Sequence, residues 1–160
     1  LNSFDPCYIR IPKTPLENIY DEKYQFILGE PSIIKEGKNI SILSYGITLH
    51  ESIKAAFELE KRGASTQVIN ISSFRPLNEN SLLEKISNSS LIFCIEDHQQ
   101  NGGLTSELLK IFNRHDFHRH LHSINIKFPL ESGHLTDILV KQELDSKHIY
   151  EQIKNLYLIN

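Results

Sequence analysis

The chain has 160 residues, of which 39% are hydrophobic and 23% are charged, and its formal net charge is -3 at pH 7. These values are typical of one globular domain and exclude a chain that is disordered throughout. The acidic balance provides no basic field for nucleic acid or an anionic membrane, and no apolar run approaches the ~18 residues of a transmembrane helix. We therefore expect no nucleic-acid partner, no membrane association and a cytoplasmic location.

The cysteines and the start of the chain carry two further expectations. Cys7 falls in a predicted linker and Cys94 in a predicted buried strand, so we expect no disulfide framework and interpret Cys94 as a small core residue. The chain begins with leucine and contains no methionine. We therefore expect a fragment or a processed piece of a longer protein.

The first part of the chain predicts a linker followed by a hairpin. Residues 7–11 form a short β-type run, and residues 13–24 have no hydrophobic period, which indicates a strand tail and a linker. Two β-type runs at 32–36 and 39–45 flank Gly37. Because glycine adopts the backbone angles of tight turns, these runs predict a hairpin and hence one antiparallel strand.

A helix is predicted after the second run. Thr48 and Glu51 have the spacing of a capping box, which predicts a helix that starts at Thr48, and Gly63 stands where a C-terminal glycine belongs. The apolar residues expected on the buried face of this helix are Leu49, Ile53, Ala56 and Leu59.

Strands alternate with helices along the rest of the chain. This alternation predicts an α/β fold: a three-layer, Rossmann-like, mostly parallel sheet with one antiparallel strand and helices on both faces. The predicted strands are 66–71, 91–95 and 121–128, the last closed by Pro129, and the predicted helices are 79–86 capped by Asn78, 104–112, 135–144, and 146–158 capped by Asp145.

The candidate site lies at strand ends, because ligands of open α/β sheets bind outside the carboxyl ends of the strands. Glu96, Asp97 and His98 follow the buried strand 91–95, and glycines precede two predicted helices whose N-termini could bind an anion. Neither site is specific, and turn formation and packing are the favoured explanation of these glycines. Neighbouring strand residues point to opposite faces, so the three polar residues cannot all reach one substrate unless the loop twists them. The candidate ligand or interface residues are Tyr45, Gly46, Thr48, Arg75, Glu96, Asp97, His98, Gly102 and Gly103.

Several catalytic and nucleotide-binding motifs are absent from the sequence. There is no GxGxxG after a strand, no GxxxxGKS or GxxxxGKT, and no GxSxG nucleophile elbow. The run HDFHRHLH at 115–122 could bind zinc or nickel, but it lies between a helix and a strand without a cysteine, so we expect a surface loop there. We therefore assign no catalytic residue, no cofactor-binding residue and no metal ligand.

Four stretches resemble, in order and spacing, the C-terminal domain of the transketolase family of thiamine-diphosphate enzymes, which includes deoxyxylulose-phosphate synthase and the 2-oxoacid dehydrogenase beta subunits. YIRI resembles the last strand of the family's pyrimidine-binding domain, and the Glu-Asp-His followed by Gly-Gly looks most like transketolase itself. The sequence departs from the family at Thr105, where a small glycine is common, and at Asn78, which replaces an aspartate. The four stretches are residues 8–11, 42–79, 95–109 and 132–153.

The resemblance implies a domain that does not carry out catalysis by itself. Residues 1–24 would be the tail of a preceding pyrimidine-binding domain and a linker, and residues 25–160 the transketolase C-terminal-like domain. The chain lacks the family's Gly-Asp-Gly motif, so the resemblance places thiamine diphosphate and magnesium in other domains of the full enzyme, which would be a homodimer acting on sugar phosphates. The partners implied are the remaining transketolase domains or a separate subunit.

Two alternatives remain open. The chain could be a ligand-binding regulatory module that uses the loops at Tyr45–Gly46 and 96–103, or the C-terminal domain of a 2-oxoacid dehydrogenase beta subunit that docks a partner subunit. An exposed apolar surface would favour assembly, whereas a concave polar pocket at those loops would favour the module.

Overall fold

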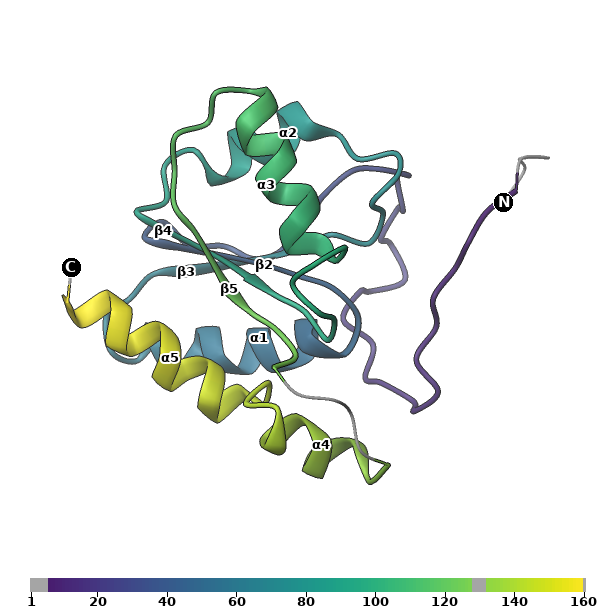
Figure 1. Cartoon of the computed structure of the whole chain (residues 1–160), viewed down its shortest axis with the longest axis vertical. Helices are drawn as coiled ribbons and strands as arrows, with labels where there is room; N and C mark the ends of the chain where they lie inside the picture. Colours follow the sequence, from purple (N-terminus) through teal and green to yellow (C-terminus); the bar gives the residue numbers. More distant parts are fainter. Residues whose placement is uncertain (1–5, 128–131, 160) are drawn as a thin grey trace.

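The computed structural model describes residues 6–127 and 132–159, which fold around a five-stranded sheet with the strand order β1-β3-β2-β4-β5 (Figure 1). β1 pairs antiparallel with β3, and all the other neighbouring strands are parallel. The mostly parallel sheet with one antiparallel strand is therefore confirmed. The strands are β1 (Ser32–Lys35), β2 (Ile40–Ser44), β3 (Thr66–Asn70), β4 (Leu91–Ile95) and β5 (Leu121–Ile124).

Helices cover both faces of the sheet, which gives the predicted three layers (Figure 1). α2 (Glu79–Ile86) and α3 (Leu104–Arg114) lie on one face. The other face carries α1 (Gly46–Glu60), α4 (Leu135–Lys141) and α5 (Ser146–Ile159). None of the described helices combines the length and the apolar composition that a membrane span requires.

The central strands are buried on both sides, so their side chains pack alternately into two separate hydrophobic cores. Ile42 and Phe93 pack in the core on the α1 and α5 side, whereas Leu43 and Cys94 pack in the core on the α2 and α3 side. Burying one large apolar side chain stabilises the fold by about 1.5–3 kcal/mol. Continuous apolar runs such as residues 91–95 are therefore favoured over an alternating pattern in these strands.

The predicted hairpin about Gly37 is wrong. β1 pairs with β3, and β2 lies on the other side of β3. A Cβ atom on Gly37 would lie only 2.1 Å from the carbonyl carbon of Thr66, so glycine is needed where the chain passes against the start of β3. Residues 7–11, which were expected to form a strand, have no regular secondary structure, and within the described part of the chain no strand pairs with them.

The predicted capping box is also wrong, because α1 begins at Gly46 and Thr48 lies inside the helix. The Thr48 hydroxyl lies 3.1 Å from the carbonyl oxygen of Ile95, at the end of β4. The Glu51 carboxylate accepts a hydrogen bond from the backbone amide of Ser146 at the start of α5, with a distance of 2.8 Å. Glu51 thus holds α5 against α1 instead of closing its own helix.

Other predicted helix ends are confirmed. Gly63 has a φ of +85°, which suits a glycine just after a helix, and the Asn78 side chain accepts the Ser81 amide as the N-cap of α2. The backbone carbonyl of Asp145 accepts the first hydrogen bond of α5, which comes from the backbone amide of Ile149. α4 ends at Lys141, before the predicted end of that helix.

The last predicted strand is shorter than expected. β5 ends at Ile124, while the prediction extended this strand to Phe128 and closed it with Pro129. Phe128 and Pro129 lie outside the described residues.

Candidate functional site

The candidate residues from two separate loops meet at the carboxyl edge of the sheet, which we define as the ends of β2, β3, β4 and β5 and the loops that follow them. Parallel strands end at the same edge, so the segment after β2 lies beside the segment after β4. The Ser44 hydroxyl donates to the carbonyl of Ile95 at 2.7 Å, and Thr48 lies within 3.1 Å of the same oxygen. These buried hydroxyls fix the start of α1 to the end of β4.

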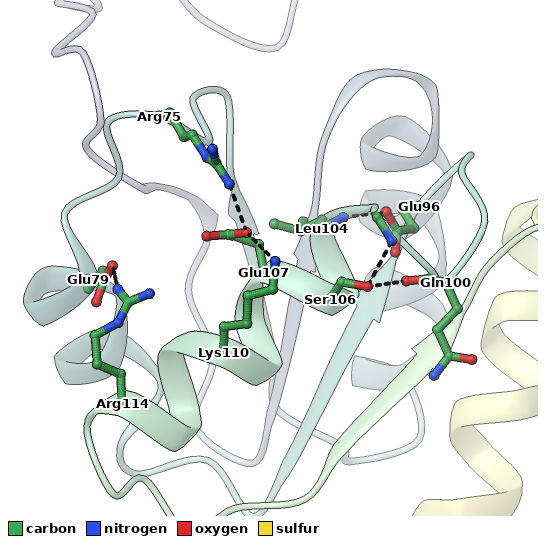
Figure 2. Close-up of polar contacts among 10 residues, drawn as sticks. Arg75, Glu79, Glu96, Gln100, Leu104, Ser106, Glu107, Lys110 and Arg114 are labelled. Carbon is green, nitrogen blue, oxygen red and sulfur yellow. Dashed lines mark hydrogen bonds and ion pairs between the residues drawn. The ribbon is translucent and has the colours of Figure 1, made fainter.

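Glu96 is fully buried and caps the N-terminus of α3. Its carboxylate accepts the amide of Leu104 at 2.7 Å, the amide of Thr105 at 3.0 Å and the hydroxyl of Thr105 at 2.6 Å; Figure 2 shows Glu96 beside Leu104. A carboxylate at a helix N-terminus is favoured by the free amides and by the helix dipole. Because the chain's own carboxylate already fills this position, the N-terminus of α3 is not open to an external anion.

The loop between Glu96 and α3 is closed by further contacts. The Ser106 hydroxyl accepts the amide of Gly102 at 3.0 Å and donates to the carbonyl of Gln100 at 2.6 Å (Figure 2). Gly102 has a φ of +83°, whereas a Cβ atom on Gly103 would lie 2.2 Å from the Glu96 Oε2 atom. Gly102 thus allows the positive φ of the turn, and Gly103 leaves space for the buried carboxylate.

Asp97 and His98 have partners different from those of Glu96. Asp97 accepts two hydrogen bonds from the guanidinium of Arg10, at 3.1 and 2.8 Å. The His98 ring is exposed, and its Nδ1 atom lies 2.8 Å from the carbonyl oxygen of Gln99. The two carboxylates and the imidazole therefore do not converge on one substrate position and do not form an acid–base cluster.

Tyr45 is half-buried beside this loop. Burial, together with the negative charges of Glu96 and Asp97, raises the pKa of its phenol, so the phenol stays neutral. Its ring contacts Phe74 edge to face, with ring centroids 4.9 Å apart. Tyr45 thus packs between loops and does not present an ionised group.

Gly46 and Arg75 occupy more exposed positions at the same edge. Gly46 begins α1 with a φ of +58°, and its neighbour Tyr45 provides no side-chain cap for this helix. The Arg75 side chain is 82% exposed and lies 3.6 Å from the Glu107 carboxylate on α3 (Figure 2). Arg75 therefore lies over α3 and not among the buried polar groups of Ser44, Thr48 and Glu96.

The N-terminal segment, residues 6–30, lies against the carboxyl edge, and this contact was not predicted. Besides the contact of Arg10 with Asp97, the Tyr20 hydroxyl accepts the Asn70 side-chain amide at 2.7 Å. Glu30 binds α2 through its carboxylate, which accepts the side-chain amide of Asn78 at 2.9 Å. No hydrophobic period marks residues 13–24, so no signal in the sequence pointed to these polar contacts.

The donor groups at the carboxyl edge do not form a cofactor cradle. Among residues 6–127 and 132–159, no cluster of three or more His, Cys, Asp or Glu side chains could hold a metal ion. Two surface hollows, of about 360 Å³ between α1 and α5 and about 250 Å³ beside α4, contain no candidate residue. Burial raises the pKa of the Cys94 thiol, so its thiolate is disfavoured and Cys94 is a core residue, as expected.

Comparison with known proteins gives a consistent family. The transketolase, C-terminal domain family matches residues 29–149. One of the subunits of apulose-4-phosphate transketolase from Actinobacillus succinogenes is 29% identical over 115 residues, covering 72% of this chain and 37% of the relative. The beta subunit of the pyruvate dehydrogenase E1 component from Bacillus subtilis is 26% identical over 106 residues, covering 66% of this chain and 33% of the relative.

A solved structure shares the fold. The split gene transketolase described as an inactive beta4 tetramer aligns with a TM-score of 0.82 at 20% identity, covering 89% of this chain and 47% of that chain. The chain spans only about a third of the length of the two curated relatives, at 37% and 33%. Since the family matches three-quarters of the sequence at residues 29–149, the chain belongs to the transketolase C-terminal domain family.

Proposed function

We propose that the chain is the C-terminal assembly domain, or a separate C-terminal subunit, of a thiamine-diphosphate-dependent transferase of the transketolase type. The full enzyme would move two-carbon ketol units between sugar phosphates in the cytoplasm, as part of carbohydrate metabolism. The catalytic site would be built by other domains, and this chain alone would be inactive. The full enzyme would be a homodimer.

The observation that carries this proposal is the closure of the carboxyl edge by the chain itself. The buried Glu96 carboxylate occupies the amides of α3, and Arg10 and Tyr20 of the N-terminal segment bind residues of the edge. A regulatory module would need an open polar pocket there. This closure supports a role in assembly over ligand binding.

Exposed apolar residues also support assembly. Tyr8, Ile9 and Ile11 are 90%, 60% and 78% exposed, and they lie in a segment without regular secondary structure. Apolar residues gathered on a surface are typical of protein contacts. We propose that residues 1–24 lead from a preceding pyrimidine-binding domain, which would cover residues 8–11, and that residues 25–160 form the C-terminal domain.

The carboxyl edge does not fit thiamine diphosphate. A diphosphate would need free amides or cations, but the amides of Leu104 and Thr105 bind Glu96, and the added negative charge would repel a phosphate. Asp97, which could otherwise help to bind magnesium, is paired with Arg10. We therefore propose that the cofactor and its magnesium bind to the remaining domains of the enzyme.

Calorimetric titration of the chain with thiamine diphosphate and magnesium, paired with a transketolase assay on ketose and aldose phosphates, tests the proposal. We expect neither binding nor turnover by the chain alone. Turnover should require a polypeptide that supplies the pyrophosphate-binding and pyrimidine-binding domains. Tight cofactor binding by this chain alone would contradict the proposal.

The similarity to a pyruvate dehydrogenase E1 beta subunit favours a second candidate, the C-terminal domain of a 2-oxoacid dehydrogenase beta subunit. In that case the reconstituted enzyme would decarboxylate a 2-oxoacid instead of transferring a ketol unit. Assaying both reactions with the same reconstituted sample distinguishes the two candidates, because each predicts activity in only one assay.

A further inference from the structure

A pair of histidines stands at the free edge of the sheet, away from the carboxyl edge. His122 lies in β5, the last strand of the sheet, and His120 precedes β5 directly. Residues two apart in an extended chain project from the same side. Their imidazole rings accordingly contact each other edge to face, with centroids 4.3 Å apart and an angle of 70° between the ring planes.

The surroundings hold one ring and leave the other accessible. His122 stacks on the buried Phe93 ring, with centroids 5.0 Å apart, which fixes its orientation. His120 is exposed. Within the described part of the chain, neither imidazole has a hydrogen-bond partner. The pair therefore offers two imidazoles with free ring nitrogens in contact with each other, one held in place and one exposed.

We propose that His120 and His122 form a two-imidazole chelate for a divalent ion of the Zn²⁺, Ni²⁺ or Cu²⁺ class, with water completing the coordination. Metal–imidazole bonds are about 2.0–2.1 Å long, so one ion can join two nitrogens that lie up to about 4 Å apart. The centroids are 4.3 Å apart, and the exposed His120 ring can bring a nitrogen within that separation of the His122 ring by rotation about its own side-chain bonds. Imidazole suits these ions better than it suits Mg²⁺ or Ca²⁺.

The site has two protein ligands, fewer than the three that a closed structural or catalytic site uses, so it should exchange its ion readily. This site is independent of the proposed assembly role.

Calorimetric titration of the untagged chain with Ni²⁺ tests the chelate. Cys7 is an exposed thiol that could also bind the ion, so every variant should carry Cys7→Ser. We expect the chain to bind one Ni²⁺. His120→Gln should lower the affinity for Ni²⁺ at least about tenfold, because losing even a residue that only hydrogen-bonds a metal ligand lowers affinity by that factor. NMR should show paramagnetic broadening of the His120 and His122 ring signals.

The matched control is His118→Gln, which changes a histidine of the same run that makes no ring contact with the pair. It should bind Ni²⁺ like the parent chain. His120 is exposed, so His120→Gln should fold normally, and circular dichroism can verify this. Unchanged affinity in His120→Gln, an equal loss in His118→Gln, or one ion per two chains would each overturn the proposal.

Discussion

The carboxylate of Glu96, at the end of β4, binds both the backbone amide and the hydroxyl of Thr105 in the first turn of α3. Thr105 is the position at which the sequence departs from the small glycine common in the resembling family. The structure gives this residue a local role, because its hydroxyl supplies a third donor to a carboxylate that is fully buried.

Replacing Glu96 with glutamine should destabilise the fold markedly. The glutamine amide would place an N–H₂ group against an amide donor of Leu104 or Thr105, leaving buried donors without an acceptor. We expect the free energy of unfolding to fall by about 3 kcal/mol. Urea denaturation measures this change. Asp97→Asn is the control, since its partly exposed pair with Arg10 should contribute less than about 1 kcal/mol.

Gly103→Ala and Gly102→Ala should differ in cost although the residues are neighbours. A Cβ atom at Gly103 would strike the Glu96 carboxylate, whereas one at Gly102 meets open space and suffers only from its φ of +83°. We expect a loss of about 1–2 kcal/mol for Gly102→Ala, from backbone strain alone, and a larger loss for Gly103→Ala. Thermal unfolding tests this order. The reverse order would mean that the Glu96 side chain moves aside freely.

The two glycine variants can also be tested for coupling to the carboxylate. In a Glu96→Ala background, the clash of Gly103→Ala with the carboxylate is removed and only the approach to the Gln99 carbonyl oxygen, at 2.8 Å, remains, so Gly103→Ala should become less costly while Gly102→Ala keeps its cost. A double-mutant cycle measures this interaction energy. Strict additivity for Gly103 would contradict the proposed close approach.

Asp97→Asn should loosen the N-terminal segment without unfolding the domain. The variant weakens the paired hydrogen bonds to Arg10, which join residue 10 to the loop after β4. We expect faster hydrogen exchange in residues 6–12, with the exchange of β4 unchanged. Arg75→Gln is the control, because the pair of Arg75 with Glu107 is long at 3.6 Å and lies elsewhere. Equal exchange in Asp97→Asn and the parent would count against the contact.

The contribution of Glu30 should depend on pH. Hydrogen bonds from Lys85 and Ser81 lower the pKa of this carboxyl group below its ordinary value of 4.5. Because the folded pKa is depressed, the stabilisation is present above pH 4.5 and is lost as the pH falls through the folded pKa. Glu30→Gln should therefore reduce stability by about 1 kcal/mol at pH 7 and by much less at about pH 3.

Urea denaturation of Glu30→Gln at the two pH values tests this sign. Glu84→Gln is a suitable control, since Glu84 is exposed on the same helix, α2. A cost for Glu30→Gln that is equal at both pH values would show that packing, and not charge, accounts for its effect.

Local patterns predicted the strands and helices because their causes are local. The apolar run 91–95 is buried as expected, and the Asn78 cap depends on an amide only three residues away. The partners of Gly37 and Glu51 could not be predicted in this way. Gly37 packs against Thr66, and Glu51 binds Ser146, which is 95 positions along the chain.

In the candidate site, too, the sequence predicted the local features and missed those that depend on distant contacts. The sequence located the polar residues after β4, and in the structure Glu96 and Asp97 bind different partners, α3 and Arg10. It could not reveal that Glu96 is buried as a helix cap, because that depends on how the loop folds back. Arg10 was missed because a single arginine in a short β-type run carries no signal for a distant partner.

The contacts of the N-terminal segment bear on where this domain can be cut for laboratory work. A shortened version starting at residue 29, where the family match begins, would remove Arg10 and Tyr20. The Asn70 side chain, whose Oδ1 atom already has no hydrogen-bond partner, would then lose its bond to Tyr20 as well. A boundary drawn from similarity alone would remove these two contacts with the carboxyl edge, so expression should begin before residue 10.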